Sequence, residues 1–456
     1  MRVVLLSTYE LGRQPFGLAS PAARLIDAGA TVTCCDLAVQ ELDPEEITTA
    51  DLVAFYLPMH TATRLATGVV AQVKQLNPTA HLCFYGLYAS VNERYLRSLG
   101  AGTVLGGEFE DGLVALVQRL DTATAGADSA PQVEPVISLA RQHFAVPDRH
   151  GLPGLEHYAH LVLGPDEHRL VGYTEASRGC KHLCRHCPIV PVYNGRFRLV
   201  PQDVVLEDIA RQVAAGAQHI TFGDPDFLNG PGHAIPLVEA FHQRFPALTY
   251  DVTVKIEHLV KLTTLLPTLR DTGCLFVTSA VESVDPVILE KFDKRHTRQE
   301  FESVVARFRE LGLTLNPTFV TFTPWTTLDG YIDLLRTLLA LDLVANVSPI
   351  QYAIRLLIPA GSRLLELPDV QALIEPFDER ALAYPWTHSE PRVDALYEAV
   401  RIIAREASTH GSRRDVFDQV WCAAHRAAQR SAPTIAWRGG QGPQTPIPFL
   451  SEAWFC

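Results

Sequence analysis

Short apolar runs alternate with longer amphipathic segments over the first 122 residues. The apolar runs cover residues 3–7, 31–37, 52–57, 81–86 and 103–107. Segments with helical spacing of apolar residues lie between them, at 21–28, 62–75, 91–99 and 111–120. Strands and helices that alternate in this way predict an α/β unit with a parallel, doubly wound sheet.

Five strands in this unit, residues 1–122, fit a flavodoxin-like Rossmann domain. Ligands of such sheets bind at the carboxyl ends of the strands, so we expect the loop 8–17 to line any site there. Residues 121–135 are small or polar and lack an apolar period, which is typical of a linker. With the irregular stretch that follows, the predicted linker spans 123–170.

The alternation of strands and helices resumes at residue 172. Candidate strands are 172–177, 219–223, 249–254, 274–281, 315–322 and 349–357, with helices such as 204–215 and 298–311 between them. Six βα units predict a partial (β/α)6 barrel over residues 171–364, with function at the carboxyl ends of its strands. Residues 365–456 predict a mostly helical C-terminal extension with a Pro- and Gly-rich tail.

Composition narrows the class of protein. The 456 residues are 47% hydrophobic and 20% charged, as in ordinary globular proteins. A net charge of −12 argues against nucleic acid or an anionic membrane as partner. The first apolar run is too short for a signal peptide. Because nine cysteines occur without a secretory signal, we expect a cytoplasmic protein whose clustered thiols serve metal or redox chemistry.

Three cysteines directly follow the first strand of the second unit, in the spacing C-x3-C-x2-C: Cys180, Cys184 and Cys187. Thiolates this close can hold one metal centre. Zinc would want a fourth ligand, for which His182 and His186 are candidates. A [4Fe–4S] cube bound by three cysteines would keep one iron open for a substrate or cofactor.

A loop of this spacing after the first strand of a β/α barrel resembles the radical SAM superfamily. The resemblance implies that the three cysteines hold a [4Fe–4S] cluster whose open iron chelates S-adenosylmethionine (SAM). It also implies that one electron from the cluster cleaves the sulfonium S–C bond. The residue before the third cysteine is usually aromatic in the family, and here it is His186, whose imidazole can stack on adenine.

Further residues resemble the family's SAM-binding segments in the same chain order. Asp224 and Asp226 follow the second strand, where the family binds the methionine amino group. Glu282 and Ser283 end the fourth strand, similar to the segment that reaches the ribose and the carboxylate. Arg355, on the sixth predicted strand, can pair with the SAM carboxylate. A structural ion pair is the alternative for this arginine.

A Rossmann-like unit before such a barrel resembles the cobalamin-binding class. Glu108 and Glu110, after Gly107, match the G-E-x-E segment that closes those domains. The D-x-H-x-x-G motif that supplies a lower cobalt ligand is absent, and the loop 8–17 contains no histidine. Cobalamin binding and a domain that kept the fold without the ligand therefore both stay open.

The chain ends in Trp454, Phe455 and Cys456. This tail, with residues 323–327 and 355–362, resembles the radical SAM proteins named for a terminal Cys-Cys-Ala-Glu-Pro or Cys-selenocysteine-Ala-Glu-Pro. Some of those are associated with organoarsenical synthesis, in which an aminocarboxypropyl group moves from SAM to arsenic. We expect Cys456, with Cys422, to handle a substrate or a metalloid. We also expect a UGA selenocysteine codon after Cys456. The alternative is that Cys456 is a terminal thiol without a function.

These features predict a radical SAM enzyme that cleaves SAM reductively and transforms or alkylates a small molecule. Cobalamin-dependent methyl transfer and aminocarboxypropyl transfer to a soft atom such as arsenic are the competing reactions. A protein that senses redox state through an Fe–S or zinc centre is the non-enzymatic alternative. The expected partners are a small-molecule substrate and an electron donor such as flavodoxin or ferredoxin, without nucleic acid or membrane.

Overall fold

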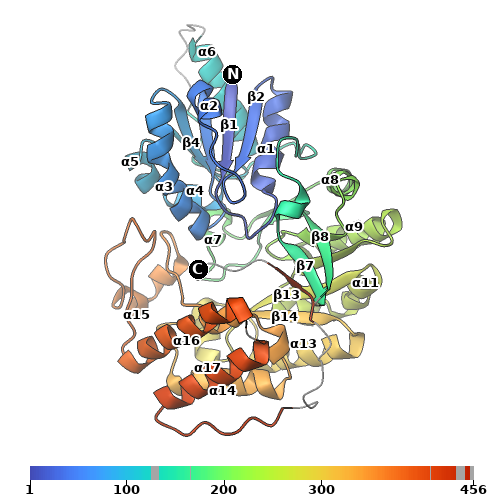
Figure 1. Cartoon of the computed structure of the whole chain (residues 1–456), viewed down its shortest axis with the longest axis vertical. Coiled ribbons are helices and arrows are strands. Elements are labelled where there is room, and N and C mark those ends of the chain that lie inside the picture. Colours follow the sequence, from blue (N-terminus) through green and yellow to red (C-terminus); the bar gives the residue numbers. More distant parts are fainter. Residues whose placement is uncertain (125–132, 165, 411, 438–446, 452–456) are drawn as a thin grey trace.

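A computed structural model of the chain describes residues 1–124, 133–164, 166–410, 412–437 and 447–451. Two α/β units lie one above the other in Figure 1, and the C-terminal helices pack beside the lower one. Among the described residues, no helix combines the length and the apolar character needed to cross a membrane.

The first unit is a parallel sheet in the order β2-β1-β3-β4-β5-β6. Its strands are β1 (Arg2–Ser7), β2 (Thr31–Asp36), β3 (Leu52–Tyr56), β4 (His81–Tyr85), β5 (Thr103–Gly107) and β6 (Ile137–Ser138). The first five strands have the flavodoxin-like order, so the predicted fold class is confirmed. Every residue of β3 is buried, because apolar clusters cover both faces of the sheet.

Helices flank both faces of this sheet (Figure 1). They are α1 (Phe16–Asp27), α2 (Pro44–Thr49), α3 (His60–Leu76), α4 (Leu87–Val91), α5 (Glu93–Ser98) and α6 (Glu110–Thr124). The single helix predicted over 91–99 is divided at Asn92, whose side-chain amide donates back to the Tyr88 carbonyl at 2.8 Å. An asparagine that bonds to the local backbone in this way competes with a continuous helix.

The interval 123–170 contains regular structure at both ends. β6 adds to the first sheet beside β5. η1 (Leu155–His157), a 3-10 turn, and β7 (His160–Gly164) follow, and β7 pairs antiparallel with β8 (Glu167–Thr174) of the second unit. The segment therefore contributes one strand to each sheet.

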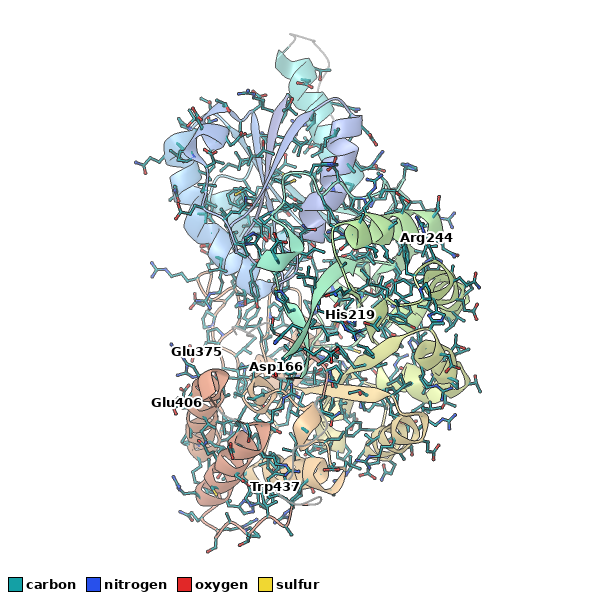
Figure 2. All side chains as sticks on the ribbon, turned by 45° about the vertical axis from the view of Figure 1, so that its right-hand side comes forward. Asp166, His219, Arg244, Glu375, Glu406 and Trp437 are labelled. Carbon is teal, nitrogen blue, oxygen red and sulfur yellow. The ribbon has the colours of Figure 1, made fainter. Side chains whose placement is uncertain are left out.

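The second unit is a sheet in the order β14-β13-β12-β11-β8-β7-β15. β8, β11 (His219–Phe222), β12 (Thr249–Thr253), β13 (Cys274–Glu282) and β14 (Thr314–Phe319) are parallel neighbours. His219, labelled in Figure 2, lies in this sheet, where its Nε2 is 2.9 Å from Asp251 Oδ1. The helices are α8 (Gln202–Ala214), α9 (Pro231–Arg244), α10 (Ile256–Lys261), α11 (Leu266–Asp271), α12 (Pro286–Phe292), α13 (Arg298–Leu311) and α14 (Leu328–Ala340), with the 3-10 turns η2 (Phe227–Asn229), η3 (Thr263–Leu265) and η4 (Val344–Asn346).

The sixth predicted strand, 349–357, differs in the structure. Residues Pro349–Tyr352 form the 3-10 turn η5, and only a single parallel bridge joins Arg355 to Phe322 beyond β14. Proline favours the first position of a helical turn and removes a donor from a sheet ladder. The parallel sheet is thus a partial barrel of five full strands and one bridge.

The C-terminal extension contains η6 (Arg363–Glu366), α15 (Pro368–Gln371), α16 (Pro391–His410), α17 (Arg413–Ala427) and β15 (Phe449–Leu450). Phe417 of α17 packs on Trp437 with ring centroids 5.8 Å apart (Figure 2). β15 then pairs antiparallel with β7 at the open edge of the sheet. The end of the described chain therefore returns to the barrel instead of leaving it.

Candidate active site at the cysteine loop

Two short strands bracket the cysteine loop. β9 (Ser177–Gly179) precedes the loop and pairs antiparallel with β10 (Phe197–Leu199), which follows α7 (Val190–Tyr193). Gly179 has a φ of +75°, and a Cβ there would lie 2.3 Å from the Tyr193 ring. Only glycine suits this corner. The loop consequently begins just beyond the carboxyl end of β8, at the edge where barrels of this kind carry their sites.

The three thiols are held in a partly buried turn. Cys184 is 7% exposed, and its carbonyl accepts the backbone N–H of Cys187 at 3.2 Å. Burial raises the pKa of Cys187 to about 12 and raises the pKa of Cys180 above its usual value. In the metal-free chain the thiols of Cys180 and Cys187 are therefore protonated near neutral pH, so metal binding must release their protons.

The spacing of possible ligand atoms separates a cluster from a single zinc ion. Within the described chain, the one group of three such atoms that all lie within 4.8 Å of one another is formed by His182, Asp226 and His258. The sulfurs of the cysteine loop are therefore spread more widely than the distance of about 3.8 Å that three thiolates on one zinc ion require. Three cysteines on one loop with this wider spread fit a [4Fe–4S] cluster.

The two loop histidines do not complete a zinc site with the three cysteines. His182 Nε2 lies 3.5 Å from Asp226 Oδ2, and His186 Nε2 lies 3.1 Å from Glu282 Oε1. The His186 ring packs on Phe292 with centroids 4.3 Å apart. Each imidazole is engaged with a partner on another element, which leaves the three thiolates without a fourth protein ligand from the loop.

Glu282 occupies a strained position at the carboxyl end of β13. Its φ is +67°, and the register with β14 shifts between Ala280 and Glu282. Burial alone would raise the pKa of Glu282, but the charge of Lys294, 3.3 Å away, and the His186 contact lower it to about 2. A left-handed backbone at a buried carboxylate costs energy, and such strain is concentrated at functional sites. Glu282 is therefore an ionised acceptor held directly beside the cysteine loop.

Asp224 and Asp226 lie in the same segment after β11 but have different partners. Asp224 accepts the Ala176 N–H at 2.9 Å and the Ser177 hydroxyl at 2.5 Å. Burial raises the pKa of Asp224 to about 7. Both of its oxygens thus fix the corner between β8 and β9. Asp226 is 1% exposed, and one oxygen accepts the Leu228 N–H at 3.3 Å.

Several residues near the loop were not identified from the sequence. Asn229 Oδ1 lies 3.8 Å from Cys180 Sγ and accepts the Lys181 N–H. His258 and Glu257 lie on α10, just after β12. The available sequence signal was their position at the carboxyl end of a barrel strand. They lack a motif spacing, so sequence alone could not connect them to residues in other βα units.

The remaining predicted residues have other surroundings. Ser283 is buried, and its hydroxyl accepts the Asp285 N–H at 3.1 Å. Arg355 stacks on Trp386, 3.7 Å from the ring centroid, and donates to Asp394 at 2.7 Å. Its guanidinium thereby ties the barrel to the C-terminal extension. Cys422 is exposed on α17, and Cys456 lies outside the described residues.

A buried charge network joins the two α/β units next to the loop. Arg178 of β9 lies 2.6 Å from Glu110 and 2.7 Å from Glu175, with Glu108 at 3.7 Å. The Arg178 side chain is 7% exposed. Tyr193, on the far side of the cysteine loop, donates its hydroxyl to Glu108 at 3.0 Å. The G-E-x-E segment of the first unit therefore binds both flanks of the cysteine loop.

This network predicts a pH-dependent contribution to stability. Burial raises the pKa of Glu108 to about 7, against the charge of Arg178. An unfolded glutamate titrates near about 4.3. Between these values the folded chain binds more protons, so the free energy of unfolding is expected to fall as pH rises. Glu108→Gln should remove this pH-dependent part of the free energy of unfolding, which amounts to up to roughly 3 kcal/mol.

The thermal unfolding midpoints of the wild type and of Glu108→Gln, measured at about pH 5 and about pH 7.5, test this prediction. The matched control is Glu93→Gln, which alters a half-exposed i,i+4 pair with Arg97 on α5. An exposed pair of this kind contributes about 0.3–0.5 kcal/mol. Equal pH slopes in wild type and Glu108→Gln would contradict the assignment.

In a sheet of this fold, a corrinoid would bind at the carboxyl ends of the strands. Glu10 is 5% exposed, and its Oε2 has no hydrogen-bond partner. Burial raises the pKa of Glu10 well above its usual value, which leaves a neutral carboxyl group that can donate a hydrogen bond. Tyr56 and Tyr85 stand nearby with ring centroids 5.4 Å apart. The unpaired Glu10 oxygen suits an amide group of a corrinoid, and the loop 8–17 contains no histidine to bind its metal.

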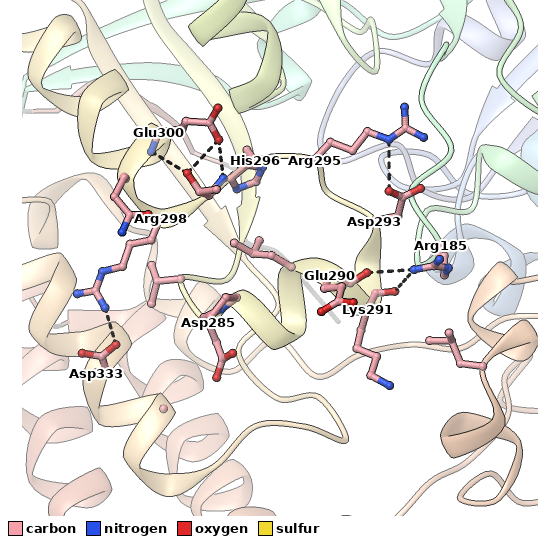
Figure 3. A pocket seen from close by; sticks show the side chains of 17 residues that line it. Arg185, Asp285, Glu290, Lys291, Asp293, Arg295, His296, Arg298, Glu300 and Asp333 are labelled. Carbon is pink, nitrogen blue, oxygen red and sulfur yellow. Dashed lines mark hydrogen bonds and ion pairs between the residues drawn. The ribbon is translucent and has the colours of Figure 1, made fainter.

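A pocket of about 1030 Å³ borders the cysteine loop at Arg185 (Figure 3). Its cations have partners within the chain. Arg185 donates to the carbonyls of Glu290 and Lys291, Arg295 pairs with Asp293 at 3.3 Å, and Arg298 pairs with Asp333 at 2.7 Å. Because two of these three arginines are paired with carboxylates, the pocket is a weak candidate for an anionic ligand.

Comparison with known proteins adds to this geometry. Residues 174–336 match the family model described as Radical SAM superfamily. A ribosomal protein uS12 methylthiotransferase, RimO, of Geobacter sulfurreducens is 23% identical over 175 residues, which cover 36% of this chain. The match spans 38% of that protein's length. The region that matches the family model contains the cysteine loop and the carboxyl ends of the next strands.

Solved structures resemble a larger part of the chain. OxsB is a cobalamin-dependent SAM radical enzyme that was solved with aqua-cobalamin and SAM. The structural match includes 93% of this chain and 71% of the OxsB chain, with a TM-score of 0.68 and 13% identity. TsrM from Kitasatospora setae is a radical SAM methyltransferase that was solved with cobalamin and a [4Fe–4S] cluster. The structural match includes 75% of this chain and 73% of the TsrM chain, with a TM-score of 0.59 and 18% identity. At these identities the likeness establishes the fold.

The family model favours an enzyme over the redox-sensing alternative. The superfamily uses a [4Fe–4S] cluster with SAM, and the fit of the cysteine loop to such a cluster agrees with that. Residues 174–336 therefore match the Radical SAM superfamily, and the overall fold is like that of the cobalamin-dependent enzyme OxsB.

Proposed function

We propose that this enzyme cleaves SAM reductively at a [4Fe–4S] cluster held by Cys180, Cys184 and Cys187, and alkylates a small molecule with the help of cobalamin. The observation that carries the proposal is the cysteine loop itself. It starts at the carboxyl end of the first barrel strand, and the G-E-x-E segment of the Rossmann unit contacts it from both sides. Both structural relatives were solved with cobalamin, which supports placing a corrinoid between the units.

The proposed roles follow from the charges and partners of each side chain. When bound, the cluster supplies the electron for reductive cleavage of SAM. Glu282 is an ionised acceptor beside His186, which suits hydroxyl or ammonium donors of SAM. Asp224, Ser283 and Arg355 have partners in the chain, so they support the site by holding the surrounding segments in place, and Asp226 uses one of its two oxygens in this way. Glu10, with its neutral carboxyl, suits the amides of a corrinoid.

Anaerobic reconstitution with iron, sulfide and SAM tests the proposal, with dithionite in place of the expected flavodoxin- or ferredoxin-class donor. We expect 5′-deoxyadenosine, and we expect hydroxocobalamin added at about 10 μM to co-elute with the chain. Replacing His60 or His81, the histidines of the first unit, should leave the cobalamin spectrum unchanged. Absence of any SAM cleavage product would overturn the enzyme assignment, and absence of bound cobalamin would overturn the methyl-transfer reading.

Aminocarboxypropyl transfer to a soft atom such as arsenic is the second candidate. It is favoured by the absence of a histidine from the loop 8–17. It breaks a different S–C bond of SAM, so methylthioadenosine would replace 5′-deoxyadenosine among the products. The product analysis described above therefore separates the two reactions without knowledge of the substrate.

The resemblance to the CCAEP and CUAEP proteins remains part of this proposal. It rests on the segments 323–327 and 355–362, which flank the barrel opening between β14 and the Arg355 bridge. Cys422, exposed on α17, is the described thiol proposed to act with Cys456 on a soft substrate atom. Loss of arsenite binding in Cys422→Ser would support this role, and unchanged binding would count against it.

A further inference from the structure

Three potential metal ligands converge beside the cysteine loop from three separate βα units. His182 lies within the loop, Asp226 follows β11, and His258 lies on α10 after β12. Their ligand atoms all lie within 4.8 Å of one another. The residues are 8%, 1% and 4% exposed, respectively. Such a set of two imidazoles and one carboxylate is a recurring donor set for zinc and ferrous iron.

Two distances among these side chains match the spacing of ligands on one metal ion. Ligands about 2.0–2.1 Å from a tetrahedral ion lie about 3.3 Å apart. His182 Nε2 is 3.3 Å from His258 Nε2 and 3.5 Å from Asp226 Oδ2. Asp226 Oδ2 and His258 Nδ1 approach to 2.7 Å but are not aligned as a hydrogen bond.

Two of these buried atoms have no hydrogen-bond partner. Asp226 Oδ2 and His258 Nδ1 are both unpaired, although their side chains are almost fully buried. Burying a polar atom without a partner is costly, about 1–3 kcal/mol for each group. A cation bound among the three side chains would give these atoms a partner and remove that cost.

The surroundings of His182 also fit a ligand role. Its Nδ1 lies 3.4 Å from Glu257 Oε2, and Glu257 is itself held by Lys255 at 3.1 Å and Lys261 at 2.6 Å. Metal-binding histidines usually present their second nitrogen to a carboxylate, which fixes the ring orientation. The Glu257 contact therefore leaves Nε2 of His182 directed at Asp226 and His258.

We propose that His182, Asp226 and His258 bind one divalent transition-metal ion, zinc or ferrous iron, separate from the cluster of the cysteine loop. Three protein ligands leave at least one coordination position for water or for an oxygen, nitrogen or sulfur atom of the substrate. Because His182 lies between Cys180 and Cys184 in the loop, the ion is adjacent to the cluster. It would serve as a Lewis acid that positions the substrate.

Metal analysis of the full chain tests this proposal without any activity measurement. The Cys180, Cys184 and Cys187→Ala variant removes the cluster, so that visible absorption reports added metal. We expect it to bind one Co²⁺ per chain with d–d bands of a four- or five-coordinate ion. Parallel titrations with Zn²⁺ and anaerobic Fe²⁺ determine which of the two is preferred. In the reconstituted wild type, we expect one metal equivalent beyond the four irons of the cluster.

Single substitutions locate the site. Adding His258→Ala or Asp226→Asn should remove the Co²⁺ equivalent; asparagine still accepts the Leu228 N–H. Glu257→Gln should weaken binding by about 10- to 100-fold. The matched control is His296→Ala, because His296 is also buried with both ring nitrogens unpartnered but lies outside the triad. Failure of both the cysteine variant and the wild type to bind extra metal, or equal binding by His258→Ala and His296→Ala, would overturn the proposal.

Discussion

Replacing Cys180, Cys184 and Cys187 together by alanine is expected to abolish the brown chromophore of the anaerobically reconstituted protein and all cleavage of SAM. The cluster would lose every thiolate that the loop supplies. The two loop histidines cannot compensate, because His182 and His186 are engaged with Asp226 and Glu282. Iron and sulfide analysis, the absorption spectrum and chromatography of SAM products measure the outcome.

The control for this prediction is a cysteine that lies in a core. Cys34 faces the apolar cluster beneath α1 and is 8% exposed. Cys34→Ala should keep the full complement of iron and the same product yield. If the triple variant still holds about four irons per chain, the cluster is bound elsewhere and the site assignment is wrong. If Cys34→Ala also loses iron, the loss reflects general instability.

Replacing Arg178 by methionine is expected to destabilise the enzyme by about 3–5 kcal/mol, the cost of leaving buried charges without their partner. Three carboxylates, of Glu108, Glu110 and Glu175, surround this guanidinium in the absence of bulk water. Burial raises the pKa of Glu175, and the remaining charge would have no cation to balance it. The loss should appear as a lower thermal midpoint and as easier proteolysis between the two units.

An exposed ion pair on the first α/β unit provides the comparison. Arg24 pairs with Asp111 at 2.8 Å, and the carboxylate is 49% exposed. Arg24→Met should cost at most about 1 kcal/mol, because water screens such pairs. Adding Glu108→Gln to Arg178→Met should recover part of the stability by removing one unpaired carboxyl. Equal effects of the Arg178 and Arg24 substitutions would show that the buried network does not hold the units together.

Local sequence determined the fold class and the cluster loop. Apolar runs of five or six residues mark strands buried on both faces, so β1 to β5 were identified close to their observed bounds. Cys180, Cys184 and Cys187 could be identified because all three ligands lie on one loop, whose spacing is itself visible in the chain. The predicted strand 349–357 was wrong in part, since Pro349 starts a 3-10 turn and only Arg355 bridges to β14.

Tertiary structure decided what surrounds the cluster loop. Asp226, His258 and Glu282 follow three different strands, and only the curvature of the sheet brings them to His182 and His186. The residues that form these contacts are separated by dozens of positions in the sequence, so their spacing along the chain does not predict the contacts.

Tertiary structure likewise decided the role of the G-E-x-E segment. The sequence predicted only that this segment ends a Rossmann domain. In the structure, Glu108 and Glu110 form ion pairs with Arg178 of the barrel. For Arg355 the sequence left a SAM contact and a structural ion pair open, and in the structure it lies against Trp386 and pairs with Asp394. A charged side chain binds whichever opposite charge or aromatic face the packed units bring within reach. The sequence by itself therefore determined the elements and the metal-binding loop, and packing between the units decided which charges meet there.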